Sequence, residues 1–218
     1  MQLVILYTGV VEHIDRTHTD AATPPALRHV EAFLNTLDER SFVRRGQRHL
    51  GGDLLAGEEA LAEWLAARDL LRPGDLVDRD SFELAVALRR TLRGALAARA
   101  GLWSDAEAAV VLESLPLYLG VGPSGTVRLR PLEENGACGA IAGLAADVAN
   151  AVAAGTWSRL KMCASADCRW VAYDGSRNGL GRWCAMGSCG NRAKTRTYRR
   201  RLTTSRAPAG VDDGVVGS

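Results

Sequence analysis

The sequence predicts an α+β protein that is mostly α-helical. A helical N-terminal domain with a small β-hairpin precedes a small cysteine-rich module that ends in a basic helix. Apolar residues recur at helical spacing over most of 28–158, and the spacing then changes to that of short strands around one turn. Four cysteines and the most basic run crowd the end of the chain. We therefore expect domains over 1–157 and 158–204, and a disordered tail over 205–218.

Three stretches of the N-terminal domain place apolar residues on one helix face. Residues 25–40, "PALRHVEAFLNTLDER", and residues 57–71, "GEEALAEWLAARDLL", follow the i, i+3, i+4, i+7 spacing. The third stretch, 81–101, is rich in Ala and Leu, with Ser81 as its expected N-cap and Gly101 as its expected C-cap. These patterns predict three helices.

Further elements are expected on either side of these helices. Two strands over roughly 115–121 and 126–130 are predicted because a Gly-Pro-Ser-Gly turn joins them. A helix of small residues follows over 139–160. The brief apolar stretch at 3–11 predicts one more short buried strand.

The apolar runs also bear on location. No run approaches the roughly 18 to 20 apolar residues that a membrane span requires. The N-terminal stretch "MQLVILYTGVVEHID" has no basic n-region and no clear cleavage site, so it does not resemble a secretory signal. We expect a cytoplasmic protein with no membrane partner.

The formal net charge of +2 is the sum of two opposite parts. Residues 159–206 hold 12 Lys and Arg against 2 Asp and Glu, a balance of +10. The rest of the chain holds 15 basic and 23 acidic residues, a balance of −8. Such a basic module attracts a polyanion more readily than it attracts an acidic substrate or partner.

The spacing of four cysteines predicts a metal site. Cys163, Cys168, Cys184 and Cys189 form the pattern C-x4-C-x15-C-x4-C, and the residues inside each pair suit a tight turn. Zinc binds four thiolates tetrahedrally at about 2.3 Å, and two such knuckles can supply them. We expect one zinc ion in a zinc-ribbon-like module. Four thiolates leave no open coordination position, so this metal would be structural rather than catalytic.

Three other interpretations of the cysteines stay open. Two disulfides fit the pairs, although a reducing cytoplasm disfavours them. An iron–sulfur cluster is formally compatible with four cysteines. Small buried thiols are the third interpretation, and they suit the separate Cys138 better than two evenly spaced pairs.

No motif in the sequence favours an enzyme. HExxH, GxSxG and P-loop patterns are absent, and residues 1–158 show no cluster of general acid, base or nucleophile. The closely spaced glycines of "GVGPSG" at 120–125 are explained by the hairpin turn that is predicted there. We therefore expect that the protein is not an enzyme. Asn35 is a polar residue in an apolar stretch and is a candidate for lining a ligand pocket, against the alternative of a buried structural hydrogen bond.

The cysteine-rich stretch "RLKMCASADCRWVAYDGSRNGLGRWCAMGSCGNRAKTRTYRRR" resembles the CGNR zinc finger, which is named for the tetrapeptide that stands here at 189–192. The likeness covers about residues 158–202 and includes both cysteine pairs. Such fingers usually follow a mostly helical domain called ABATE, which "AFLNTLDER" at 32–40 and "DLLAGEEALAEWLAARDLL" at 53–71 resemble. The resemblance implies a stress-induced regulator of transcription.

The basic run after the last cysteine predicts a helix that binds nucleic acid. Asn191 is a good N-cap, so a helix is expected to start near Arg192, with Tyr198 and Leu202 packed on the finger. Arginine can bond a phosphate or a guanine edge in two places, and a helix fits the major groove. The candidate contacts are Arg177, Arg182, Asn191, Arg192, Lys194, Arg196, Arg199 and Arg200.

These observations favour a transcription regulator that binds double-stranded DNA. Its N-terminal domain would respond to a small-molecule effector, form a homodimer, or do both. An RNA-binding zinc protein and an adaptor that binds an acidic protein partner remain as alternatives.

Overall fold

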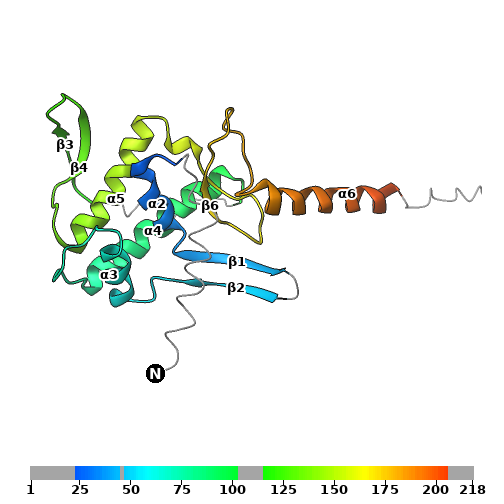
Figure 1. Ribbon diagram of the computed structural model, residues 1–218, viewed down its shortest axis with the longest axis horizontal. Helices are drawn as coiled ribbons and strands as arrows, with labels where there is room; N and C mark the ends of the chain where they lie inside the picture. Colours follow the sequence, from blue (N-terminus) through cyan, green and yellow to red (C-terminus); the bar gives the residue numbers. More distant parts are fainter. Residues whose placement is uncertain (1–22, 45–46, 103–114, 206–218) are drawn as a thin grey trace, which may run out of the picture. The chain divides into compact units, whose positions relative to one another are not determined.

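The computed structural model describes residues 23–44, 47–102 and 115–205, and it divides into two compact units between Cys184 and Ala185. The expected strand over 3–11 and the tail from residue 206 lie outside the described residues. Within the described part, helices are combined with three antiparallel pairs of strands, and a helix ends the chain (Figure 1). This arrangement confirms the predicted fold class.

The first unit is built around packed helices. They are α2 (Pro25–Leu34), α3 (Glu58–Ala66), α4 (Arg79–Arg99) and α5 (Gly136–Ala153). Helices α2, α4 and α5 pack against one another, and α3 packs against α4. Phe33, Leu88 and Ile141 are fully buried in the shared core. Burial of each such side chain contributes about 1.5–3 kcal/mol to folding.

The ends of α4 refine the predicted boundaries. The N-cap is Asp78 rather than Ser81, because the Asp78 carboxylate accepts a hydrogen bond from the Ser81 backbone N–H at 2.8 Å. At the other end Gly101 has a positive φ of 69°. The Gly101 N–H donates to the Ala98 carbonyl, and the Leu102 N–H donates to the Ala97 carbonyl. These two hydrogen bonds form the Schellman motif. Gly101 therefore ends the helix as expected, one position after the C-cap.

A hairpin lies where the sequence analysis extended the first helix. Helix α2 stops at Leu34, and the chain then forms β1 (Leu37–Arg44) and β2 (Gln47–Asp53), which pair antiparallel. The prediction of helix through residue 40 was wrong. The hairpin shows no apolar alternation, since Val43 and Leu50 are largely exposed. Ion pairs to α4, described below, stabilise it instead.

The second hairpin agrees with its prediction. β3 (Leu117–Val121) and β4 (Val127–Pro131) pair in register from Leu117↔Pro131 to Val121↔Val127. The Asn150 amide of α5 holds this hairpin, because it donates to the Leu129 carbonyl and accepts from the Leu129 N–H, both at 2.9 Å.

The third hairpin carries the first cysteine pair. After a short 3-10 turn, η2 (Trp157–Arg159), β5 (Leu160–Met162) pairs antiparallel with β6 (Val171–Tyr173). Leu160, Met162 and Val171 belong to the same hydrophobic core as the helices. This part of the cysteine-rich module is therefore packed on the helical body. The division into domains at 157 and 158 stays a prediction.

Helix α5 also has the length and composition of a membrane span. Among the described residues it is the one helix that meets both criteria, and half of its most apolar window is buried. Its contacts with α2, α4 and β4 are those expected of a core helix.

The second unit consists of a π-helical turn, η3 (Met186–Gly190), that continues directly into α6 (Asn191–Ser205). Asn191 has helical φ and ψ of −66° and −39°, so it does not act as the expected N-cap. Its side-chain amide instead donates to the Gly187 carbonyl at 3.4 Å. Tyr198 and Leu202 are 63% and 47% exposed, and their expected packing on the finger stays a prediction.

Candidate metal centre and basic surface

The four predicted cysteines converge. The Sγ atoms of Cys163, Cys168, Cys184 and Cys189 all lie within 4.8 Å of one another. Three of the four side chains are buried, and Cys184 is half-buried. No disulfide joins any of the five cysteines, all of which the structure describes, and this argues against the disulfide interpretation. The fifth, Cys138, is exposed and lies 3.3 Å from the Ser81 hydroxyl, so its expected burial was wrong.

The sulfur geometry fits one zinc ion. A tetrahedron with Zn–S bonds of about 2.3 Å has sulfur–sulfur edges of about 3.8 Å. The Sγ atoms of Cys168 and Cys184 are 3.6 Å apart, close to such an edge. A set of four soft sulfur donors without an oxygen ligand suits zinc better than magnesium or calcium. The site can therefore hold one structural zinc ion.

Hydrogen bonds among the thiols of Cys163, Cys168 and Cys184 shift the pKa values of these groups in opposite directions. Hydrogen bonds from Cys168 and Cys184 lower the pKa of Cys163 to about 2. Donation to Cys163 raises the pKa of Cys168 to about 12 and that of Cys184 well above its usual range. Only one of these crowded sulfurs carries a negative charge readily. A zinc ion reverses this preference, because its charge favours thiolates and binding releases protons.

An arginine supports the last ligand. Arg192, on the first turn of α6, donates from Nη2 to the Cys189 sulfur at 2.9 Å, and its side chain is half-buried. Such a bond places positive charge beside a thiolate and orients a metal ligand. Arg192 was predicted to contact nucleic acid. In the structure at least part of its guanidinium serves the metal centre.

The first cysteine pair is anchored by an asparagine from the N-terminal half. The Asn35 amide donates to the Val171 carbonyl at 2.8 Å and accepts from the Val171 N–H at 2.9 Å. Asn35 is 9% exposed, and Val171 is fully buried. Both amide atoms therefore serve a structural contact with β6. Its role in a ligand pocket stays a prediction.

Replacement of Asn35 by alanine should destabilise the protein by about 1–3 kcal/mol, because it leaves a buried N–H and a buried carbonyl of β6 without partners. Urea unfolding of the zinc-loaded protein measures the loss. Asn150→Ala is the matched control, since it removes the same two-bond contact to Leu129 where the backbone is half-buried and water can replace the amide. An equal loss in the two variants would contradict the prediction.

Two buried arginines of α4 connect the helix to the first hairpin. Arg89 pairs with both carboxylate oxygens of Asp53 at 2.6 Å and donates to the Thr36 hydroxyl at 2.8 Å. Arg93 pairs with Glu39 on β1. The two side chains are 4% and 6% exposed. They lie one helical turn apart on α4, beside the apolar face.

Arg93 also reaches the cysteine-rich module. Its guanidinium donates to the Leu34 carbonyl at 2.7 Å, at the end of α2, and to the Arg169 carbonyl at 3.2 Å, next to Cys168. Arg169 itself pairs with Glu39 at 3.1 Å. One side chain thus links α2, α4, β1 and the first cysteine pair. The sequence did not predict this network, since an arginine pair at i, i+4 within an apolar helix is its only local signal.

The loop between the two cysteine pairs is organised around Asp174. Its carboxylate accepts hydrogen bonds from the Ser176 N–H and hydroxyl, from Lys161 Nζ at 3.0 Å, and from the Gly181 N–H at 2.7 Å. Burial would raise the pKa of Asp174, but these hydrogen bonds, first that of the Ser176 side chain, hold it below its usual range. The carboxylate therefore fixes the loop that carries Arg177.

The predicted basic contacts lie on two segments. Arg177 and Arg182 are exposed on the loop between the cysteine pairs, and the Arg182 guanidinium lies 5.6 Å from the centre of the Trp183 ring. On α6 the exposed predicted residues are Asn191, Lys194, Arg196 and Arg199. Arg200 belongs to α6, but its side chain lies outside the described residues.

Comparison with known families agrees with this site. Residues 159–202 match the CGNR zinc finger, which places the chain among zinc-finger proteins. Residues 27–175 match ABATE, a family described as "Putative stress-induced transcription regulator". This match covers more than half of the chain, so the chain belongs to the ABATE family. Neither description names an enzyme. Comparison with curated proteins finds no match.

The two matches overlap at 159–175, which includes the first cysteine pair. The same residues pack against the helical core through β5 and β6. Both the overlap of the two matches and the packing of β5 and β6 indicate that the first cysteine pair belongs to the helical body as well as to the finger.

Proposed function

We propose that the protein regulates transcription by binding double-stranded DNA through its zinc finger and α6. The observation that carries this proposal is the one-signed charge of the C-terminal segment. Residues 175–206 contain no acidic residue, and Lys194, Arg196 and Arg199 are exposed on α6. Like charges at i, i+4 destabilise an isolated helix by about 0.2–0.5 kcal/mol per pair, so a helix whose charges are all basic favours a polyanionic partner.

DNA is the polyanion that best fits these groups. A zinc-stabilised basic helix can enter the major groove, where arginine bonds guanine O6 and N7. Arg177 and Arg182 lie outside α6 and are suited to phosphate contacts, which position the protein without reading sequence. The family description supports a role in transcription. The N-terminal helical domain would then sense an effector or mediate dimerisation.

The double substitution Arg196→Ala/Arg199→Ala should weaken binding to duplex DNA by tenfold or more at about 150 mM salt, because two phosphate or base contacts are lost. If both contact phosphate, the slope of log K against log[salt] should become shallower by about 1.8. Fluorescence anisotropy over a salt series measures both quantities. Arg192 is left intact because it supports Cys189.

The matched control removes the same charge from the first unit, as Arg48→Ala/Arg72→Ala, at two exposed positions. It should leave the slope unchanged. Undiminished DNA affinity in the α6 variant would overturn the proposal. Stronger binding to a structured RNA than to duplex DNA at one salt concentration would favour the RNA alternative, and weak, sequence-blind binding to both would favour the adaptor.

A further inference from the structure

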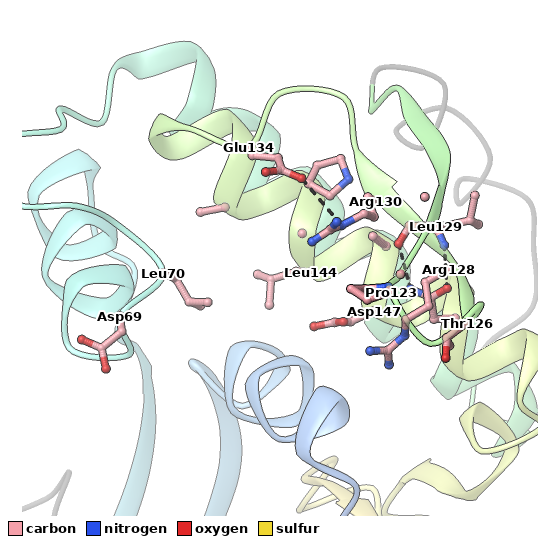
Figure 2. Close-up of a pocket in the computed structure, with 18 of the residues that line it drawn as sticks. Asp69, Leu70, Pro123, Thr126, Arg128, Leu129, Arg130, Glu134, Leu144 and Asp147 are labelled. Carbon is pink, nitrogen blue, oxygen red and sulfur yellow. Dashed lines mark hydrogen bonds and ion pairs between the residues drawn. The ribbon is translucent and has the colours of Figure 1, made fainter.

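A groove of about 630 Å³ lies on the first unit, between α5, the β3–β4 hairpin and the end of α3 (Figure 2). Its volume is within the range of small-molecule sites. On the α5 wall Gly143 leaves room beside the helix, since a Cβ at this position would meet no atom within 4 Å. Leu70 and Leu144 form an apolar wall. Neither the zinc site nor the candidate nucleic-acid contacts include a residue of this groove.

Asp147 of α5 faces the groove without a bonding partner. In the described part of the chain its carboxylate accepts no hydrogen bond and forms no ion pair, although the side chain is half-buried. Burial raises the pKa of Asp147 to about 6, and the nearby Arg128 charge opposes this rise. A partly buried carboxylate without a partner is costly, and a ligand cation would relieve that cost.

The other charged residues of the groove limit the classes of ligand that it can bind. Arg130 lies 3.7 Å from Glu134, so this pair is neutral overall, and Asp69 stands apart toward the α3 end (Figure 2). Arg128 on β4 is exposed and, within the described residues, has no hydrogen bond or ion pair. The groove thus offers one unpaired anion and one unpaired cation near each other, with an apolar wall beside them.

We propose that this groove binds a free α-amino acid with an apolar side chain. The ammonium group would pair with Asp147 and the carboxylate with Arg128, and the hydrocarbon part would contact Leu70 and Leu144. Arg128 disfavours a simple amine, because a ligand with only positive charge would be repelled by the guanidinium. The proposal deepens the sensing role proposed for the N-terminal domain and gives that role a ligand class.

Isothermal titration calorimetry of the zinc-loaded full chain without DNA tests the site, with L-leucine as the probe. Leucine should bind. Isopentylamine, which lacks the carboxylate, should bind about tenfold more weakly, and isocaproate, which lacks the amine, should not bind detectably. The absence of heat from leucine up to about 10 mM, or equal binding of isocaproate and leucine, would overturn the proposal.

Two isosteric or near-isosteric variants assign the contacts. Asp147→Asn should lower leucine affinity by about tenfold or more, and Arg128→Gln should weaken leucine but not isopentylamine. Unchanged leucine affinity in Asp147→Asn would contradict the assignment. Because DNA is absent from these titrations, their failure leaves the DNA-binding proposal untouched, and the anisotropy experiment can fail while leucine still binds.

Urea unfolding of Asp147→Asn over a pH series serves two purposes. It shows that the variant is folded, and it tests the state of the Asp147 carboxylate without a ligand. Because the pKa of Asp147 is raised in the folded state, the folded protein holds a proton that the unfolded chain releases between about pH 4 and 6. The stability that this bound proton contributes to the folded protein is therefore lost as pH rises through that window. Asp147→Asn should gain stability relative to the parent protein from pH 4 to pH 7, as measured by urea unfolding. Asp69, Arg128, Arg130 and Glu134 also line the groove and remain in both proteins. A difference in stability between the two proteins that stays constant from pH 4 to pH 7 would contradict the conclusion that the Asp147 carboxylate is unpaired.

Discussion

Removal of zinc is expected to lower the melting temperature of the protein by about 8–16 °C. Ligand that binds only the folded state stabilises it by about 4 kcal/mol when its free concentration is a thousand times Kd. In a chain of this size, each kcal/mol corresponds to about 2–4 °C. Calorimetry with and without a strong chelator measures the shift.

Cysteine variants separate the metal site from the remaining thiol. Native mass spectrometry should find one zinc ion per chain in the parent protein and in Cys138→Ser, because Cys138 lies outside the cluster. Cys168→Ser should lose the ion or hold it much more weakly, since its sulfur is a buried member of the set. Full zinc content in Cys168→Ser, or a melting temperature insensitive to chelation, would refute the four-thiolate site.

Arg93→Met is expected to cost about 2–4 kcal/mol of folding free energy. The substitution removes one partner of a largely buried ion pair and leaves the carbonyls of Leu34 and Arg169 without this donor. Methionine preserves much of the aliphatic volume, so lost packing contributes little. Glu39 is 32% exposed and keeps Arg169 as a partner, which places the expected loss below that of a fully buried charge.

An exposed arginine outside α4 offers a control for this substitution. Arg72→Met should change stability by no more than about 0.5 kcal/mol, because the Arg72 side chain is exposed. Urea unfolding of both variants, of Glu39→Gln and of the double variant Arg93→Met/Glu39→Gln gives the coupling energy between Arg93 and Glu39. Additive losses in the double variant would show that the ion pair contributes nothing and that the carbonyl contacts carry the effect.

The elements that the sequence predicted well are those with local signals. Helix α4 follows an apolar repeat and ends at Gly101, and the β3–β4 hairpin surrounds a Gly-Pro-Ser-Gly turn. The β1–β2 hairpin was missed because its stabilising partners are not local. Asp53 pairs with a residue 36 positions away and Glu39 with one 54 positions away. Charged side chains in a strand give no alternating apolar pattern to detect.

In the candidate sites, too, local spacing predicted some residues, and those that depend on distant contacts were missed. The four cysteines were predicted because their spacing within one short segment limits where they can lie, and the structure brings them together. The contact between Asn35 and Val171 joins residues 136 positions apart, so no spacing rule could reveal it. Asp147 looked like an ordinary polar position of a helix. Its importance depends on a hairpin that folds over α5 and forms a groove there.

The contact between Asn35 and β6 makes metal binding and the folding of the helical body mutually dependent. Because the first cysteine pair is packed into the core, any change that loosens α2 or α4 must also weaken the hold on zinc, by the same free energy with which zinc tightens the body. Zinc occupancy then reports the integrity of helices that contain none of its ligands. A protein with this construction would lose its metal as an early sign of damage far from the sulfurs.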